Sequence, residues 1–178
     1  MSDTKHILIA GFGGQGILFT GKFLANAALN EDKQLSWLPS YGPEMRGGTA
    51  NCSVIISERL IGSPIVDKPD VLIAMNLPSL DKYENATVSG GYIFVNSSLI
   101  ERKVEREDVH VFYVPATSLA SENKLDGLAN MIMLGKLLKE CDIMDNNSIS
   151  EVLKQVIPAK HKDMYDYNVK AIDIGYNL

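Results

Sequence analysis

A glycine-rich run near the start of the sequence is the segment whose residue types and spacing could bind a ligand. It reads Gly11-Phe12-Gly13-Gly14-Gln15-Gly16 and fits the pattern G-x-G-x-x-G between an apolar run and an amphipathic one. Glycines at such a junction allow a tight turn, and the free N–H groups at the start of a helix attract an anion such as phosphate. Two main interpretations stand side by side: an anion or a partner contacts this turn, or its glycines only let the next helix pack closely onto the sheet. The candidate residues are Gly11, Gly13, Gly14, Gln15 and Gly16.

A complete dinucleotide site would need one more feature. It places an acidic residue about 20 positions after the glycines, at the end of the second strand, to bind the ribose. The predicted second strand instead ends in Leu38-Pro39-Ser40, whereas Glu31 and Asp32 come before that strand begins. The sequence therefore argues against an ordinary NAD site.

A second segment, residues 39–49, is rich in glycine and proline and follows the second strand. It carries Glu44-Met45-Arg46 between Gly42-Pro43 and Gly47-Gly48. In a doubly wound sheet such a loop lies beside the first glycine turn, so Arg46 could present its planar donors to a phosphate or carboxylate. The alternative is an ordinary turn in which Arg46 pairs with Glu44 or caps carbonyl groups. The candidate cofactor-binding or interface residues here are Tyr41, Glu44, Arg46, Gly47 and Gly48.

No catalytic or metal-binding residues are predicted elsewhere in the sequence. Cys52 and Cys141 are far apart and no Cys-x-x-Cys pair exists, so the chain cannot hold an iron–sulfur cluster or a four-cysteine zinc site alone. Cys52 lies in an apolar strand and is interpreted as a buried structural thiol. The histidines have no metal-ligand spacing: His6, His110 and His161.

Two other features receive structural interpretations. Asn130 begins an apolar helical run, and because a buried amide needs partners, we expect it to bond a neighbouring loop. The mixed-charge run from Glu101 to Asp108 is interpreted as a solvated connection.

Composition narrows the class of protein further. The chain has 178 residues, of which 46% are hydrophobic and 22% charged, with a formal net charge of −5. These values are typical of one folded domain and provide no broad basic surface for nucleic acid or anionic lipid. The apolar runs are too short for a membrane span and there is no long apolar signal region. With scattered free thiols, these features favour a cytoplasmic protein.

The order of apolar runs predicts the fold class. Strands are expected at 5–10, 34–38, 51–57, 71–75, 92–96 and 109–114, and helices at 17–30, 77–83, 127–140, 148–157 and 161–174. Strands that alternate with helices are typical of a parallel sheet covered on both faces. We therefore predict a single α/β domain over residues 1–178, Rossmann-like and three-layered, with a mostly parallel sheet and a helical C-terminal third.

Taken together, the two glycine segments resemble those of the gamma subunit of 2-oxoacid:ferredoxin oxidoreductases, of the 2-oxoglutarate or 2-oxoisovalerate type. The resemblance continues through Val114-Pro115-Ala116-Thr117, residues 129–135, residues 168–171 and Gly175. The small subunit of indolepyruvate:ferredoxin oxidoreductase, which usually has glutamine where this chain has Met45, is the second choice. A stand-alone NAD(P)- or nucleotide-binding Rossmann protein is a further alternative.

The resemblance implies an enzyme complex that decarboxylates a 2-oxoacid on thiamine diphosphate and transfers the acyl group to coenzyme A. Electrons pass through [4Fe-4S] clusters to ferredoxin. Thiamine diphosphate would lie between alpha and beta subunits, and the clusters on beta and on a ferredoxin-like delta subunit. This chain would complete the complex, with no cofactor or catalytic residue of its own and no activity alone.

Overall fold

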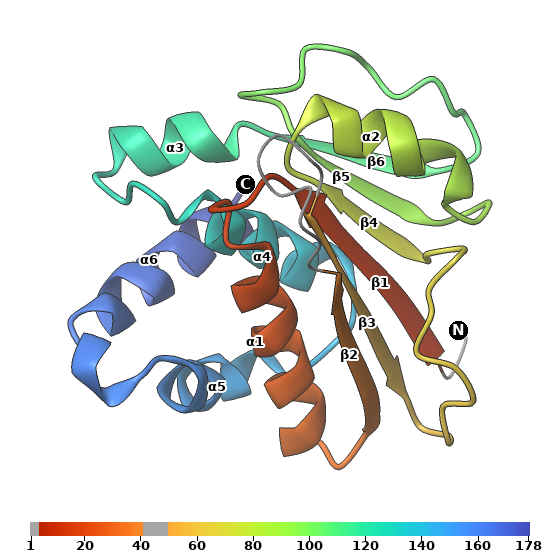
Figure 1. Cartoon of the computed structure of the whole chain (residues 1–178). Helices are drawn as coiled ribbons and strands as arrows, with labels where there is room; N and C mark the ends of the chain where they lie inside the picture. Colours follow the sequence, from red (N-terminus) through yellow and green to blue (C-terminus); the bar gives the residue numbers. More distant parts are fainter. Residues whose placement is uncertain (1–3, 41–49) are drawn as a thin grey trace.

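The computed structural model describes residues 4–40 and 50–178, and its centre is a six-stranded sheet of order β2-β3-β1-β4-β5-β6 (Figure 1). β1 runs through the middle of this sheet, and its residues are paired on both sides. The strands are β1 (Thr4–Gly11), β2 (Gln34–Ser40), β3 (Ala50–Ser57), β4 (Val71–Ala74), β5 (Tyr92–Asn96) and β6 (His110–Val114).

The sheet is mixed, so the prediction of a mostly parallel sheet is confirmed in part: three of its five strand pairings are parallel. β1, β4, β5 and β6 pair in parallel, whereas β3 is antiparallel to both β1 and β2. Parallel neighbours need a crossover of a dozen or more residues, usually with a helix. The segment between β2 and β3, residues 41–49, is shorter than that, so these two strands pair as a hairpin.

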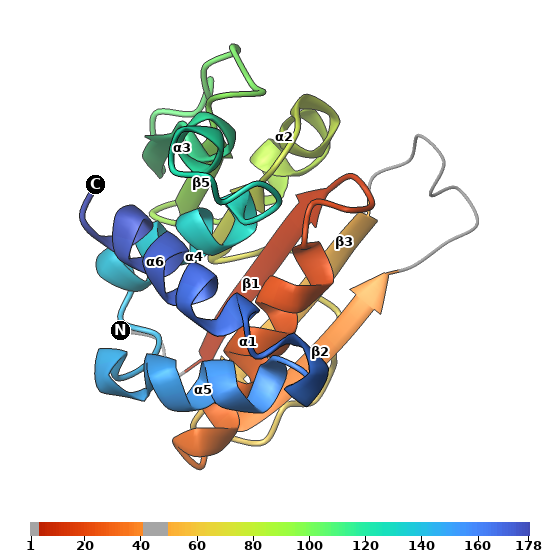
Figure 2. The ribbon, with the colours of Figure 1, turned by 90° about the vertical axis from the view of Figure 1, so that its left-hand side faces the viewer.

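Helices cover the two faces of the sheet unequally (Figures 1 and 2). α1 (Ile17–Asn30), α4 (Ala129–Glu140), α5 (Ile149–Val156) and α6 (Met164–Tyr176) lie on one face, and α2 (Leu77–Tyr83) lies on the other. α3 (Ala116–Glu122) follows β6 and contacts α4. Short 3-10 turns complete the fold: η2 (Glu84–Ala86), η3 (Asn146–Ser148) and η4 (Ala159–His161). No helix among the described residues is long and apolar enough to span a membrane.

The hydrophobic core is accordingly in two parts, separated by the sheet. Successive residues of a strand point to opposite faces, so Ile7 and Ile9 enter the large core beneath α1 and α4, while Leu8 enters the smaller core. In that smaller core Leu80 of α2 packs against the sheet. The large core holds most of the buried apolar side chains and fixes the position of α1 behind the glycine turn.

Most predicted elements agree with the structure, and α3 is the helix that the prediction missed. Helices 17–30 and 77–83 and strand 92–96 are confirmed with the same bounds. α3 is short and begins directly after Pro115, so it offers little periodic pattern. Its first turn is held instead by buried Asn96, whose Nδ2 donates to Thr117 Oγ1 at 2.9 Å.

Residues 101–108 form the solvated connection that was predicted, with most of them exposed, but the segment also has a structural function. Glu84 is only 4% exposed, and this segment supplies its partners. Arg102 Nη2 donates to Glu84 Oε2 at 2.6 Å, and the backbone N–H of Glu105 donates to Glu84 Oε1 at 2.6 Å. The charged run therefore closes over a buried carboxylate, because a buried charge must be paired and hydrogen-bonded.

Candidate functional site

The glycine turn joins the carboxyl end of β1 to the start of α1. Gly14 and Gly16 have φ angles of 87° and 72°, a left-handed conformation that glycine adopts without strain. Gly16 is the N-cap residue of α1, and no side chain caps this helix start. Among residues 4–40 and 50–178, the N–H groups of the first turn of α1 therefore lack a side-chain acceptor, as the anion-binding interpretation requires.

Gln15 has a structural function in this turn. The N–H of Phe12 donates to Gln15 Oε1 at 2.6 Å, and Gln15 Nε2 donates to the carbonyl of Met75, just after β4, at 3.2 Å. A Cβ on Gly11 would lie 2.6 Å from Gln15 Oε1 and 2.9 Å from Met75 Cβ. The Gln15 side chain thus ties the turn to the neighbouring strand, and Gly11 leaves the room that it needs.

Asn130, at the start of α4, bonds the same turn, as the sequence predicted. Its Nδ2 donates to the carbonyl of Gly16 at 3.2 Å and to Thr20 Oγ1 at 3.1 Å. The amide lies so close to Gly16 that a Cβ at that position would overlap it. The last glycine of the motif is therefore required both by its backbone angles and by the contact with α4.

A crevice opens on the carboxyl side of the sheet between the turn and the loops after β4, β5 and β6. From β1 the chain passes to β2 and β3 on one side and then to β4 on the other, and ligands of open α/β sheets bind at such a switch point. The crevice has a volume of about 290 Å³. Its walls are Gly14, Gln15, Met75, Leu99, Thr117, Ala120, Ser121, Asp126, Gly127 and Ala129.

The second glycine loop begins and ends at this same edge. Residues 41–49 lie outside the described part of the chain, so the structure does not test Tyr41, Glu44, Arg46, Gly47 or Gly48. Their flanking residues are placed: Ser40 pairs with Asn51, and Ala50 pairs with Gly11 at the start of the glycine turn. A second hollow of about 290 Å³ lies between the turn and Ala50.

The sheet topology gives a further argument against an ordinary dinucleotide site. Such a site places the ribose-binding acid on a parallel strand next to β1. Here antiparallel β3 occupies that position, and β2 lies one strand further away, ending in Leu38, Pro39 and Ser40.

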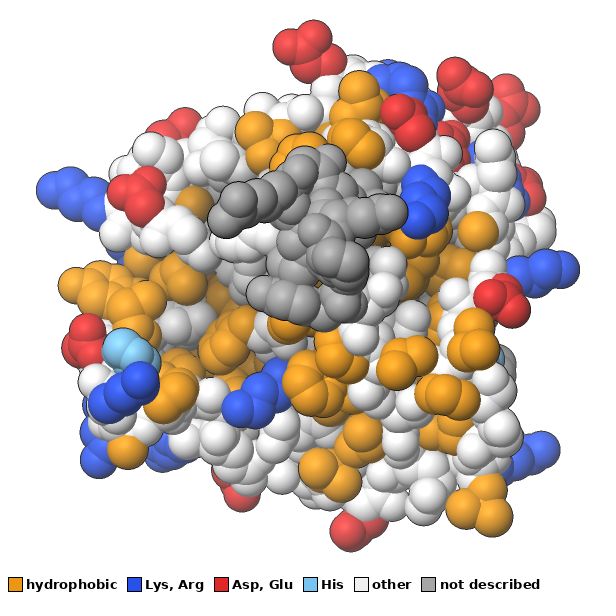
Figure 3. Space-filling view, viewed as in Figure 1, with side chains coloured by type: hydrophobic (Ala, Val, Ile, Leu, Met, Phe, Trp, Pro, Cys, Tyr) orange, Lys and Arg blue, Asp and Glu red, His pale blue; other side chains and the backbone are white. Residues whose placement is uncertain are grey.

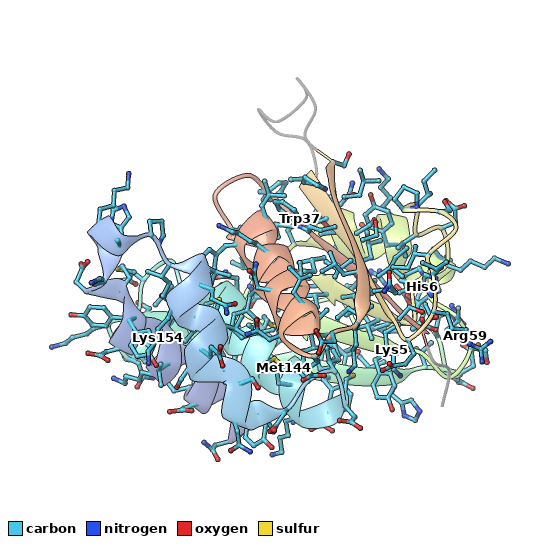
Figure 4. All side chains as sticks on the ribbon, turned by 90° about the horizontal axis from the view of Figure 1, so that it is seen from below. Lys5, His6, Trp37, Arg59, Met144 and Lys154 are labelled. Carbon is cyan, nitrogen blue, oxygen red and sulfur yellow. The ribbon has the colours of Figure 1, made fainter. Side chains whose placement is uncertain are left out.

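The cysteines and histidines do not come together among residues 4–40 and 50–178, and no cluster there could hold a metal ion. His6 lies at the amino end of β1 near Lys5 and Arg59 (Figure 4), where its Nδ1 is 3.0 Å from Asp70 Oδ2.

Cys52 is fully buried, and burial raises the pKa of its thiol to about 11. A hydrogen bond from Trp37 partly offsets this rise. Burial likewise raises the pKa of Cys141 to about 12. The structure thus confirms Cys52 as a structural thiol.

Several crevice residues were not predicted as site residues. Thr117, Ser121 and Asp126 line the crevice; they lie on α3, which was not predicted, or after it.

Asn76 lies next to the glycine turn and was not predicted either. It caps α2 by accepting from the N–H of Ser79 at 2.9 Å, and its Nδ2 lies 3.5 Å from Gln15 Oε1. The only sequence signal was a polar residue at the end of an apolar strand, as at Asn96, or shortly after one, as at Asn76. Polar residues at the carboxyl ends of parallel strands converge on one edge.

Comparison with known proteins identifies relatives of the whole chain. Residues 6–178 match the family "Pyruvate ferredoxin/flavodoxin oxidoreductase". The ketoisovalerate oxidoreductase subunit VorA of Methanothermobacter marburgensis is 39% identical over 96% of this chain, which spans 35% of that relative's length. The 2-oxoglutarate synthase subunit KorC of Methanocaldococcus jannaschii is 36% identical, over 98% of this chain and 93% of KorC.

Solved structures of similar chains have the same fold. The gamma subunit of the keto/oxoacid ferredoxin oxidoreductase from Geobacter sulfurreducens superposes with a TM-score of 0.83 and 27% identity, over 97% of this chain and 96% of that one. The 2-oxoglutarate:ferredoxin oxidoreductase of Magnetococcus marinus, solved with 2-oxoglutarate, coenzyme A and succinyl-CoA bound, gives a TM-score of 0.89 at 25% identity. The match covers 99% of this chain and 31% of that larger chain.

Proposed function

Because the chain belongs to the pyruvate ferredoxin/flavodoxin oxidoreductase family, as a gamma subunit of the 2-oxoacid:ferredoxin oxidoreductases, we propose that it serves a coenzyme A-acylating complex for 2-oxoglutarate or a branched-chain 2-oxoacid. In that reaction the 2-oxoacid loses CO₂, its acyl group passes to the sulfur of coenzyme A, and the electrons released reduce ferredoxin. Thiamine diphosphate and the [4Fe-4S] clusters would be held by alpha, beta and delta subunits.

The match to KorC over nearly the full length of both chains carries this proposal. KorC is named as a subunit of 2-oxoglutarate synthase, and we propose that this chain likewise works with other chains. Cys52 lies on β3 and Cys141 directly after α4, both buried, so they do not fit the ligand set of an iron–sulfur cluster, which needs several accessible thiolates. We therefore propose that the clusters and the electron transfer belong to the other chains of the complex.

The glycine turn and the second loop are the proposed contribution of this chain to binding. We interpret β1, the turn and α1 as a Rossmann-like unit within one gamma-type domain spanning residues 1–178. The uncapped start of α1 and the nearby start of α4, which also lacks a side-chain cap, favour a negatively charged group at the crevice. Arg46, in the loop that begins and ends at this edge, would add a planar donor for a coenzyme A phosphate or a partner carboxylate.

The surface is compatible with contacts to other subunits. Figure 3 shows hydrophobic side chains exposed over much of the face on which β2 lies. Trp37 and Leu38 of β2 are 39% and 42% exposed, and Leu60, after β3, is 89% exposed. Exposed apolar side chains in such number are typical of protein–protein contact surfaces. We propose that alpha, beta and delta subunits share this assembly in the cytoplasm, with ferredoxin as the electron acceptor.

Purification of the native assembly tests this function. The chain is tagged in its own organism, and the co-eluting proteins are identified and examined for iron–sulfur absorbance. Coenzyme A-dependent ferredoxin reduction is then measured with 2-oxoglutarate, 2-oxoisovalerate, pyruvate and indolepyruvate. We expect co-eluting cluster-bearing chains and turnover of one of the first two substrates.

Each other result identifies a different function. Turnover of indolepyruvate alone would favour the small subunit of that enzyme. A chain that elutes alone and binds NAD with micromolar affinity would contradict the proposal and favour a stand-alone dehydrogenase. Activity of the isolated chain with thiamine diphosphate would contradict its assignment as a dependent subunit.

A further inference from the structure

β2 lies at the edge of the sheet, and its side that faces away from β3 is unpaired in the part of the chain that the structure describes. β2 has β3 as its one neighbour in the sheet, and the pairing runs without a break from Gln34 to Ser40. No hydrogen bond from residues 4–40 and 50–178 reaches the outer side of β2. A free strand edge of this kind, here called the β2 edge, offers backbone donors and acceptors to another strand.

Pro39 indicates which backbone groups of β2 face outward. The pairing with β3 continues across Pro39. Because proline has no N–H to donate, it occupies a strand position whose N–H would face away from the neighbouring strand. Alternate residues of an antiparallel strand face the same way, so the N–H and carbonyl groups of Leu35 and Trp37 also point outward. The β2 edge therefore offers the donors and acceptors of Leu35 and Trp37, and one further acceptor at Pro39.

The β2 edge lacks most of the features that protect a free edge. Protected edges are short, charged or covered by another segment. β2 has seven residues, Gln-Leu-Ser-Trp-Leu-Pro-Ser, none of them charged, and its proline lies near one end.

The opposite edge strand, β6, is better protected. It has five residues, and the segment 101–108 contacts its Tyr113. The N–H of Val104 donates to the Tyr113 hydroxyl at 2.9 Å, and Lys103 Nζ lies 3.9 Å from the centre of the Tyr113 ring. Of the two edges, that of β2 is therefore the one open to another strand.

We propose that the β2 edge pairs with the β2 edge of a second copy of this chain, antiparallel and around a twofold axis at Ser36. In this register Leu35 of each copy lies opposite Trp37 of the other, and each such pair exchanges both of its N–H···O bonds. All outward N–H groups of Leu35 and Trp37 are then satisfied. A register centred on Trp37 would instead place Leu35 opposite Pro39, which cannot donate.

The side chains agree with this register. Leu35 and Trp37 pair with Ile56 and Val54, which belong to the large core, so both lie on the face that α1 covers. A Cβ on Gly21 of α1 would lie 2.9 Å from Trp37 Nε1, which confirms this position of the indole. Trp37 is 39% exposed, and in the paired edges it lies beside Leu35 of the other copy on the same face. The pairing thus buries apolar surface as well as backbone polar groups.

A second copy fits the β2 edge because a twofold interface must match itself. The edge has no charge that symmetry would bring against a like charge, and its outward donors and acceptors are matched by those of its own copy. The inference goes beyond the proposed function and does not rest on it, because the edge belongs to this chain alone. A strand of another subunit is the alternative occupant.

The first test uses the full chain with a cysteine at the proposed axis. Opposed residues that do not exchange hydrogen bonds have Cα atoms about 4.5 Å apart, within the range of a disulfide. Ser36→Cys should therefore give a disulfide-linked dimer under mild oxidation. Ser40→Cys is the control, because Ser40 is exposed on the same face of the same strand but lies far from its own copy in this register. The native thiols are buried and do not compete.

The second test measures association without a covalent link, by sedimentation equilibrium. We expect wild type to show a monomer–dimer equilibrium. Ser36→Lys should raise its Kd at least about tenfold, because like charges then meet at the axis, and should leave the melting temperature unchanged. His110→Lys adds the same charge to β6, where His110 is exposed, and should not change the Kd.

Three results would overturn the proposal: a wild type that stays monomeric, equal cross-linking of both cysteine variants, or a dimer that Ser36→Lys does not weaken. A monomeric wild type whose Ser36→Lys variant fails to assemble with other subunits would assign the edge to a strand of another chain. Dimerisation of a chain that has no oxidoreductase partners would support the pairing and contradict the proposed function only.

Discussion

Gly135 of α4 and Gly175 of α6 lie at one contact between the two helices, and neither position has room for a side chain. A Cβ on Gly135 would overlap the carbonyl of Ile172, and one on Gly175 would overlap the carbonyl of Ile132. Each glycine thus packs against a backbone carbonyl that lies three residues before the other glycine. Since the obstructing atoms are backbone, no side-chain rotation can relieve the overlap, and the helices would have to separate.

We expect Gly135→Ala and Gly175→Ala each to destabilise the chain by about 3 kcal/mol, the upper part of the range for overpacking a core. The cause is displacement of α6 from α4, which opens the large core. Urea unfolding monitored by circular dichroism measures the loss. Gly62→Ala is the matched control, because a Cβ there meets nothing within 4 Å. Equal stability of all three variants would contradict this account of the helix contact.

The glycine turn offers a second matched pair. Gly14 and Gly16 both have positive φ, but a Cβ on Gly14 meets nothing within 4 Å, whereas one on Gly16 would overlap the Asn130 amide. Gly14→Ala should cost about 1–2 kcal/mol from backbone conformation alone. Gly16→Ala should cost clearly more, because the Asn130 hydrogen bonds to Gly16 and Thr20 are lost as well. Thermal and urea unfolding compare the two, and a smaller loss in Gly16→Ala would refute the role given to Asn130.

Buried Glu84 holds the segment 101–108 against η2. Glu84→Gln removes the charge that pairs with Arg102 and should destabilise the chain by about 2 kcal/mol, the scale of a hydrogen bond to a charged group. Asp81 also bonds Arg102, at 2.9 Å, but its side chain is 55% exposed. Asp81→Asn should therefore change stability by less than about 1 kcal/mol. Hydrogen exchange of residues 101–108 should speed up in the first variant and stay unchanged in the second.

The buried thiols predict a loss of stability at high pH. Burial raises the pKa of Cys52 to about 11 and that of Cys141 to about 12, from 9.0. A raised pKa in the folded state means that the thiol contribution is fully present below about pH 9 and is lost as the pH rises toward 11 and 12. Removing both thiols, as Cys52→Ala with Cys141→Ala, should flatten this fall, although the double variant is less stable at pH 7.

Unfolding free energies of wild type and double variant between pH 7 and 11 measure that difference, so that other titrating groups cancel. In addition, both native thiols should resist a thiol reagent at pH 8 until the chain unfolds. Rapid labelling of the folded protein would show that at least one thiol is accessible.

Arg46 gives the prediction that concerns function directly. Arg46→Ala should leave the melting temperature of the chain unchanged, because a loop guanidinium contributes little to a core. In the reconstituted complex it should weaken coenzyme A binding or assembly by roughly 1.5–3 kcal/mol, and Arg46→Lys should restore only part of the loss.

The kinetic parameters separate the two roles of this residue. A raised KM for coenzyme A with intact assembly would place Arg46 at the ligand, and failed assembly would place it at the subunit interface. Unchanged melting, assembly and kinetics would leave Arg46 an ordinary turn residue.

Local features of this chain could be predicted from the sequence because they depend on neighbours along it. The strand, glycine turn and α1 helix over residues 4–30 follow from an apolar run, glycines and a helical stripe. Asn130 was expected to bond a loop because an amide in an apolar run needs partners, and the buried state of Cys52 followed from its apolar strand. The order of such motifs along the chain also led to the family.

Other features were decided only by the tertiary structure. β3 lies between β2 and β1, which no pattern within those strands specifies, because antiparallel and parallel strands with one buried face have similar periodicity. α3 is fixed by Asn96, twenty-one positions from Thr117. The Glu84 carboxylate is paired by Arg102, a residue type that would suit a solvated loop equally well. Asn130 and Asn168 line one hollow, and their common position depends on how α4 and α6 cross. Contacts between residues distant in the chain arise from packing, and packing is not encoded in any single segment.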